Sequence, residues 1–171
     1  MIRLSRLLRP TRSPVDAAVD DVMNSLDTTG PLTDPSVVVE AGSEACGYPI
    51  RVQDEPLPRG RYGMSTKTAA GKHVIIVDPS LSGDLRLHTV LHELGHILLG
   101  HNDEAGTPTP DRLTALLTGT ATAVPASCVV PQFRQWAERE NDAEKFATTV
   151  ARRLRRGLTN GHLSRLDEAF G

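Results

Sequence analysis

The sequence has few cysteines, few aromatic residues and no long apolar run. Its two cysteines, Cys46 and Cys128, do not make a disulfide framework, so we expect both to be free thiols in a reducing compartment. Phe, Trp and Tyr supply only 4% of the 171 residues, so the core must consist mainly of Leu, Val, Ile and Ala. The longest apolar runs, such as VIIV at 74–77, cover only a few residues, so we expect no membrane-spanning helix.

Neither sign of charge dominates the sequence. The 19 Lys and Arg residues and the 21 Asp and Glu residues give a net charge of −2 at pH 7. This balance offers no general reason to expect binding to nucleic acid or to a membrane. Residues 1–14 are rich in arginine, and Pro10 and Pro14 interrupt them, so they lack the continuous apolar stretch of a secretory signal. We predict a flexible basic tail over residues 1–14 and a cytoplasmic protein.

The length of the chain suits one domain, which we predict to span residues 15–171 with its core at about 45–155. Apolar residues at helical spacing predict a first helix after Pro14. Between residues 37 and 79 the sequence changes to short β-prone segments separated by Gly and Pro: SVVVEAG, GYPIRVQ, RYGMSTKT and KHVIIVDP. Their connections are too short for helical crossovers, so we predict a short, mostly antiparallel sheet.

Two long helices are predicted to follow the sheet, which makes the fold class α+β. The first begins near residue 84 and ends at Gly100, and the second covers residues 131–157. A last short helix is predicted over residues 162–170. The intervening segment 102–130 is rich in Thr, Pro, Ala and Gly, and its length suggests a lid or a cleft wall.

The stretch LHELGHILLGH, residues 91–101, holds three of the six histidines of the chain. On a helix, His92 and His96 are four positions apart and share a face, with Cβ atoms about 5–6 Å apart. Two imidazole nitrogens at this separation can bind one Zn²⁺ at about 2.0–2.1 Å each. Glu93 is rotated by about a quarter turn, so it flanks the ion, where it suits a base that acts on a water molecule.

The H-E-x-x-H pattern is short enough to occur by chance, so its surroundings must support it. Here it lies within an apolar helical stretch made of Val90, Leu91, Leu94, Ile97 and Leu98. The alternative is a core helix whose histidines are merely hydrogen-bonded. Three polar side chains on one buried turn would each need a partner, which makes that alternative costly and favours a metal site.

A catalytic zinc site needs a third protein ligand and an open position. We predict Glu140 as the third ligand, because Ala143 and Ala147 share its helical face and would let the two long helices approach closely. Glu144, one turn further, could accept a hydrogen bond from the second nitrogen of a ligand histidine. His101 is the alternative third ligand, although on a continuing helix it would point about 140° away from His96.

The two segments together resemble the ImmA/IrrE family of bacterial metallopeptidases, over roughly residues 45–155. The resemblance rests on HELGHILLGH and on the later pattern E-x-x-A-E-x-F-A, which is formed by Glu140, Ala143, Glu144, Phe146 and Ala147. It implies a small zincin-like domain of the gluzincin type with one Zn²⁺ per chain. His92, His96 and Glu140 would be the zinc ligands, and Glu93 the catalytic base. The sequence departs from the family pattern at Glu144, where Asp or Asn is common, and in lacking an L-L-M-P ending after the second helix.

The resemblance further implies an intracellular endopeptidase that cleaves or inactivates a helix-turn-helix transcriptional repressor, in the setting of phage, mobile-element or stress regulation. The sequence therefore predicts a regulatory zinc metallo-endopeptidase that acts on a protein or peptide, without direct contact to nucleic acid or membrane. The alternative is a zinc-containing regulator that binds a transcription factor without cutting it. A purely structural zinc site would require a fourth protein ligand such as His101.

Other polar residues near this site have less certain roles. His88, one turn before His92, is expected to pack or to cap the helix. His73 lies in the strand before the metal-binding helix, and that strand is expected to border the substrate through its backbone. Tyr48 and Tyr62 are candidates for polarising the scissile carbonyl, and the sequence places neither of them.

Overall fold

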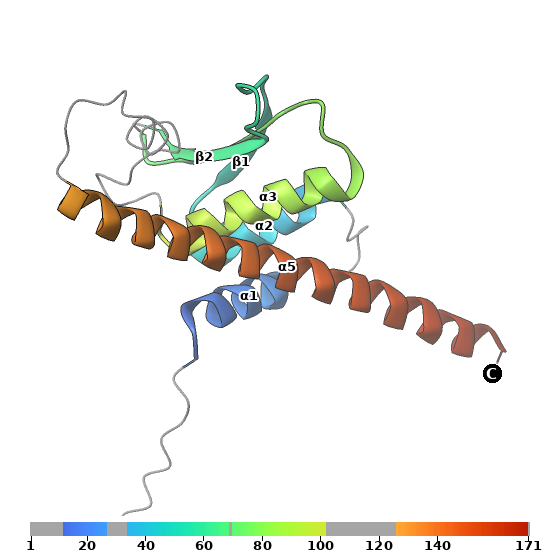
Figure 1. Ribbon diagram of the computed structural model, residues 1–171. Helices are drawn as coiled ribbons and strands as arrows, with labels where there is room; N and C mark the ends of the chain where they lie inside the picture. The colour runs from blue at the N-terminus through green and yellow to red at the C-terminus, as the bar shows by residue number, and fades with distance from the viewer. Residues whose placement is uncertain (1–11, 27–33, 69, 102–125, 171) are drawn as a thin grey trace, which may run out of the picture.

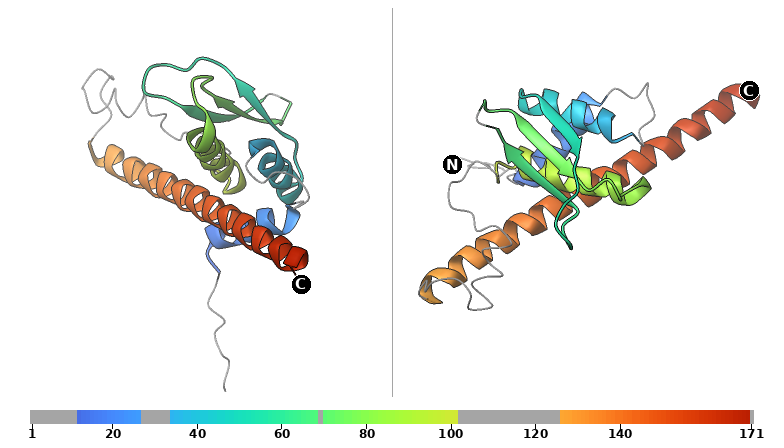
Figure 2. Two further views of the ribbon diagram at one scale, coloured as in Figure 1. Left: turned by 90° about the vertical axis from the view of Figure 1, so that its right-hand side faces the viewer. Right: turned by 90° about the horizontal axis from the view of Figure 1, so that it is seen from above.

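The protein is arranged in three layers, which Figure 1 and the left view of Figure 2 show from two directions. A small sheet covers one side of helices α3 and α2, and helices α5 and α1 lie on their other side. This computed structural model describes residues 12–26, 34–68, 70–101 and 126–170, with side chains over the first three of these ranges and over 134–156. Helix α3 lies in the middle layer and packs against α5, α2, β2 and β3.

The first two helices begin with the same arrangement, in which a polar side chain caps the helix and proline follows it. In α1 (Pro14–Ser25) the Ser13 hydroxyl accepts the backbone N–H of Asp16, at 3.1 Å. In α2 (Pro35–Cys46) the Asp34 carboxylate accepts the backbone N–H of Ser36, at 2.9 Å. Such caps satisfy N–H groups that have no partner within the helix, and proline at the first position loses no hydrogen bond.

Helix α2 corrects the prediction that SVVVEAG, residues 36–42, forms a strand. Its three consecutive valines favour a strand by intrinsic propensity. The cap and proline at its start, together with burial on one helical face, outweigh that preference. Val38 and Gly42, four positions apart, are both buried, and a Cβ atom at Gly42 would lie 2.7 Å from Leu94 Cδ1. Val38 and Val39 therefore belong to the buried face of α2, and Gly42 lets the helix approach Leu94 of α3.

The sheet has three strands, β1 (Ile50–Asp54), β2 (Gly63–Lys67) and β3 (His73–Val77), in the order β1-β3-β2. β2 and β3 are antiparallel, as the short connection between them requires, but β1 and β3 are parallel. The sheet is therefore mixed, and the prediction of a mostly antiparallel sheet is corrected. A parallel pair needs no helical crossover here, because the chain returns along β2 before it enters β3.

Helix α3 (Gly83–Leu98) confirms the helix predicted to begin near residue 84 and to carry the H-E-x-x-H pattern. Val90, Leu91 and Leu94 are fully buried, so the apolar residues around the H-E-x-x-H pattern do form its core-facing side. The helix is followed by Gly100, whose φ of 71° lies in the left-handed region that glycine adopts without strain. The chain therefore turns sharply directly after the histidine-bearing turns.

Helix α5 (Ala126–Phe170) is one continuous helix where the sequence predicted two. Its middle third packs on the rest of the fold, and its C-terminal part extends beyond the other elements (Figure 1). Glycine weakens a helix by about 1 kcal/mol relative to alanine without necessarily ending it, which is why Gly157 is no reliable stop signal. The predicted lid segment 102–130 lies mostly outside the described residues, as does most of the basic tail at 1–14.

The α+β fold class is confirmed by the helices and the small sheet. In the segments that the structure describes, no helix combines the length and the apolar character needed to cross a membrane. The assignment of residues 15–171 to a single domain stays a prediction.

Helices α3 and α5 approach each other closely at Gly95. A Cβ atom there would lie 3.0 Å from Phe146 Cδ1 and 3.3 Å from both the Cα and the carbonyl oxygen of Ala143. Ala143, Phe146 and Ala147 are fully buried in this interface. Only a glycine on one helix and an alanine on the other leave room for such an approach, so small side chains set the distance between α3 and α5.

We expect Phe146→Ala to lower the free energy of unfolding by about 3–5 kcal/mol, because it removes a fully buried aromatic ring and leaves a cavity. Urea denaturation followed by circular dichroism measures this change. Lys145→Ala, at the exposed neighbouring position of the same helix, should change the free energy of unfolding by less than about 0.5 kcal/mol. Equal effects of the two substitutions would contradict the described packing of α5 on α3.

Candidate metal centre

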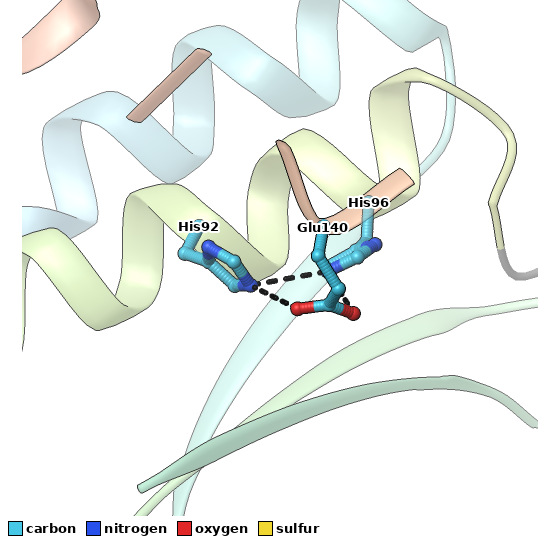
Figure 3. Close-up of side chains that lie close together, drawn as sticks. All are labelled: His92, His96 and Glu140. Carbon is cyan, nitrogen blue, oxygen red and sulfur yellow. Dashed lines mark hydrogen bonds and ion pairs between the residues drawn. The ribbon is translucent and has the colours of Figure 1, made fainter. Parts of the chain in front are cut away.

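The side chains of His92, His96 and Glu140 converge at one point between α3 and α5 (Figure 3). The Nε2 atoms of the two histidines are 3.1 Å apart. The two carboxylate oxygens of Glu140 lie 3.4 Å from His92 Nε2 and 3.5 Å from His96 Nε2. Among the described residues this is the one cluster of three or more His, Cys, Asp and Glu side chains that could hold a metal ion.

The spacing of these side chains is close to what a zinc site needs. Two atoms bound tetrahedrally at 2.0–2.1 Å from one ion are about 3.3–3.4 Å apart. The two nitrogens are 3.1 Å apart, each lies 3.4 or 3.5 Å from a different oxygen of Glu140, and one ligand atom from each of the three residues lies within 4.8 Å of the others. Two imidazoles and one carboxylate are also a donor set typical of catalytic zinc, and three protein ligands leave one position open.

Glu93, next to His92 on α3, has its hydrogen-bond partner on strand β2. Its side chain is buried, and its Oε2 accepts a hydrogen bond from the Ser65 hydroxyl at 2.8 Å. Gly63 on the same strand allows the close contact, since a Cβ atom there would lie 2.5 Å from Thr89 Cγ2 and 3.2 Å from Glu93 Cγ. Glu93 is thus held beside the metal-binding face of α3 without being one of the three converging ligands.

Burial and neighbouring charges decide which protonation states the ligands have. Burial lowers the pKa of His96 to about 4, with His92 and His101 adding to the effect against the attraction of Glu140, so its imidazole is neutral at pH 7. Burial alone would raise the pKa of Glu140, but the hydrogen bond with His92 and the nearness of His96 outweigh it and lower that pKa, so the side chain is a carboxylate. Both are in the form that binds a metal.

His92 and Glu93 are shifted in the opposite direction from those two residues. Burial lowers the pKa of His92, but the hydrogen bond to Glu140 and the charge of Glu93 outweigh it, and the pKa is raised. A metal at His92 must displace any proton bound there, so affinity falls as the pH falls. Burial raises the pKa of Glu93, and the hydrogen bond from Ser65 offsets only part of the rise. A carboxylate with a raised pKa accepts a proton more readily.

Glu144 lies one turn along α5 from Glu140, between two histidines. Its Oε2 is 3.1 Å from His88 Nε2 and 3.6 Å from His92 Nδ1, and its Oε1 accepts the Thr148 hydroxyl at 3.1 Å. Glu144 is therefore near the second nitrogen of His92 but too far for the predicted hydrogen bond, and its hydrogen-bond partner is His88. Its role in supporting His92 stays a prediction.

His101 lies on the opposite side of His96 from the ligand cluster. Its Nδ1 is 3.0 Å from His96 Nδ1, whereas the atom of His96 that faces Glu140 is Nε2. The prediction that His101 points about 140° away from His96 assumed a continuing helix. Instead α3 ends at Leu98, and the turn at Gly100 places His101 next to His96. Glu140 faces the Nε2 atoms of both histidines, whereas His101 faces the opposite nitrogen of His96, so the geometry favours Glu140 over His101 as the predicted third ligand.

Strand β3 does not border the site through its backbone, because it lies between β1 and β2, and His73 on it is buried. The strand next to Glu93 is β2. Tyr48 is exposed, and its ring lies 6.1 Å from the ring of His73. Tyr62 is also exposed, and it directly precedes β2, the strand that contacts Glu93 through Ser65.

Sequence reasoning missed Gly63 and Ser65. Both were within the segment RYGMSTKT that was predicted as β-prone, and their alternation along a strand puts them on the same face. Small residues repeated on one strand face could have indicated close contact with a helix. Nothing in the sequence, however, identified Glu93 as the side chain that they contact.

Residues 47–122 match the family model of the IrrE N-terminal-like domain, Peptidase_M78. This match confirms the resemblance predicted from the sequence and identifies this part of the chain as metallopeptidase-like. It includes the sheet and α3 with His92, Glu93 and His96, covers less than half of the chain, and ends before Glu140. No curated protein and no solved structure matches the chain.

We expect Glu140→Gln to weaken zinc binding by at least about 100-fold, since an amide replaces a charged ligand and the loss should exceed that of an outer hydrogen bond. Competition with a chromophoric chelator measures the affinity, and metal analysis gives the stoichiometry, expected to be one zinc per chain. Glu138→Gln is the matched control, because Glu138 is an exposed glutamate on the same helix. An unchanged affinity in Glu140→Gln would remove Glu140 from the site.

Proposed function

We propose that the protein is a zinc-dependent metallo-endopeptidase with a regulatory role. The proposal rests on one observation about α3. His92 and His96 meet Glu140, whereas Glu93 is held separately by Ser65 of β2. A zinc ion in this cluster would polarise a peptide carbonyl and make a water molecule more acidic. The family match supports a peptidase in general terms.

Glu93 is the residue that moves protons in this proposal. It accepts a proton from the attacking water and later donates it to the amine that leaves when the peptide bond breaks. Its raised pKa favours both steps, because the same burial that makes it a better base also lets it hold the proton until the amine departs. A structural or purely binding metal site has no need for a buried glutamate at this position.

The substrate must reach two faces of α3 at once. The ligand cluster faces α5, and Glu93 faces Ser65 on β2, so the scissile bond would lie between α5 and β2. An extended segment of a protein chain suits such a passage between a helix and a strand. We propose a helix-turn-helix transcriptional repressor as the substrate, and a cytoplasmic location, on the basis of the resemblance to the ImmA/IrrE family.

We expect Glu93→Gln to retain zinc and to lose about 10²–10⁴-fold in the rate of cleavage, because it removes the base and leaves the ligands in place. The zinc-loaded protein is incubated with the repressor encoded nearest to it, and the products are analysed by intact mass spectrometry. Two fragments whose masses sum to the repressor plus one water molecule identify hydrolysis of one peptide bond. Glu138→Gln, at an exposed glutamate, should cleave like the wild type.

Two outcomes of this assay would contradict the proposal. Full activity of Glu93→Gln would remove Glu93 as the base. An intact repressor that binds equally well to the wild type and to Glu93→Gln would instead identify a regulator that docks a transcription factor without cutting it.

We expect Ser65→Ala to lower kcat by about 10-fold, the lower end of the effect of an outer hydrogen-bonding partner, with KM and zinc content unchanged. The hydroxyl of Ser65 holds one oxygen of Glu93, and its loss lets the carboxylate rotate. Ser65→Thr keeps the hydroxyl on a residue that strands accommodate well, so it should restore most of kcat. A loss of activity shared equally by both variants would indicate a packing defect at β2 and not a role in orienting Glu93.

A further inference from the structure

The C-terminal turn of α3 ties His101 to His96 through the backbone. The N–H of His101 donates to the carbonyl oxygen of His96 at 2.9 Å, and the N–H of Gly100 donates to that of Ile97 at 3.1 Å. This pair of bonds around a left-handed glycine is a common way to end a helix, and it satisfies carbonyl groups that would otherwise have no partner. It also returns the chain toward the side of the helix that carries His96.

The side chains of the same two residues are in contact. Their Nδ1 atoms are 3.0 Å apart, and their rings meet edge to face with centroids 5.1 Å apart. The other nitrogen of His96, Nε2, faces His92 and Glu140. The two nitrogens of His96 therefore have separate partners, the ligand cluster on one side and His101 on the other.

We propose that His101 is a positioning residue that holds the His96 imidazole with Nε2 toward the metal, and this inference rests on the proposed zinc site. An imidazole that gives the lone pair of Nε2 to a metal carries its proton on Nδ1. The atom in position to accept that proton in a hydrogen bond is Nδ1 of His101, which requires His101 to carry its own proton on Nε2.

The two ligand histidines are not supported equally. His92 Nδ1 lies 3.6 Å from Glu144, a side chain that is 55% exposed and closer to His88. His96 Nδ1 has its partner at 3.0 Å, and the side chain of His96 is 12% exposed against 22% for His92, while His101 is half-buried. His101 therefore provides the shorter and drier of the two supporting contacts, so its loss should affect metal binding more than the loss of a surface carboxylate.

His101 is not a further metal ligand in this arrangement. A fourth ligand would have to approach on the Nε2 side of His96, where His92 and Glu140 converge. His101 meets the opposite nitrogen. The open coordination position that hydrolysis requires is thus preserved.

Three substitutions at His101 separate the hydrogen bond from the space that the ring fills. His101→Ala removes both, His101→Phe keeps a ring without an acceptor, and His101→Asn offers a carbonyl oxygen near the place of Nδ1. We expect His101→Ala and His101→Phe to weaken zinc binding by about 10–100-fold, and His101→Asn to bind within about 5-fold of the wild type. Competition with a chromophoric chelator measures the affinities, with no substrate present.

A further pair of variants, at Gly100, acts on the turn without changing either histidine. No atom lies within 4 Å of a Cβ built at Gly100, so the positive φ is what limits substitution there. Asn adopts this conformation and β-branched residues do not, so Gly100→Asn should keep wild-type zinc affinity and Gly100→Val should reduce it. Thermal unfolding of each metal-free variant shows whether it is folded.

The results can overturn the inference in three ways. Zinc binding by His101→Ala and His101→Phe that is as tight as in the wild type would overturn it, and so would binding by His101→Asn that is as weak as in His101→Ala. A changed visible absorption spectrum of the Co²⁺-substituted His101→Ala protein would instead make His101 a direct ligand. A wild type that binds zinc but cleaves nothing would overturn only the proposed function, whereas a wild type that binds no zinc would overturn both.

Discussion

The close contact between α3 and α5 is the constraint on which the rest of the site depends. At Gly95 the two helices are so near that a single added methyl group would meet the backbone of Ala143. A glutamate side chain is short, and Glu140 can place its oxygens within 3.5 Å of both ligand nitrogens only because the helix that carries it lies this close. Glycine costs about 1 kcal/mol within a helix, and that local cost is what permits a metal centre made from two separate helices.

The site also answers the question of how an apolar helix can carry so many polar side chains. Buried polar groups without partners are costly, and three polar side chains on these turns of α3 each have a partner. Glu93 is paired with Ser65 of β2, His92 with Glu140 of α5, and His96 with His101 of the turn that follows α3. Two other elements therefore contribute to this part of the helix, and only the contact to His101 is local.

The parts of this arrangement that follow from local geometry could be predicted from the sequence. The positions of His92, Glu93 and His96 on α3 follow from helical periodicity, and the two alanines beside Glu140 indicated a close helix pair. The structure of residues 36–42 could not be predicted, because burial of one helical face outweighs the strand propensity of its valines. The parallel pairing of β1 with β3 and the contact between Ser65 and Glu93 depend on how distant segments pack, which local patterns do not encode. The position of His101 depends on the left-handed conformation of Gly100. The assumption of a continuous helix therefore predicted the wrong direction for the His101 side chain.

Because the side chains of the proposed metal site and their supports come from several elements, we expect metal affinity and fold stability to be coupled. A ligand that binds only the folded chain stabilises it by an amount that grows with the logarithm of its concentration over its dissociation constant. The converse also holds, since any change that loosens α5 or β2 on α3 lets the ligand nitrogens and Glu140 drift apart and lowers the affinity. Variants in the buried interface and variants in the site should therefore be compared by zinc affinity and by unfolding of the metal-free protein together. Substitution of a side chain such as His101, which supports a ligand without filling the core, should change the zinc affinity far more than the stability of the metal-free protein. This difference distinguishes a positioning residue from a packing residue.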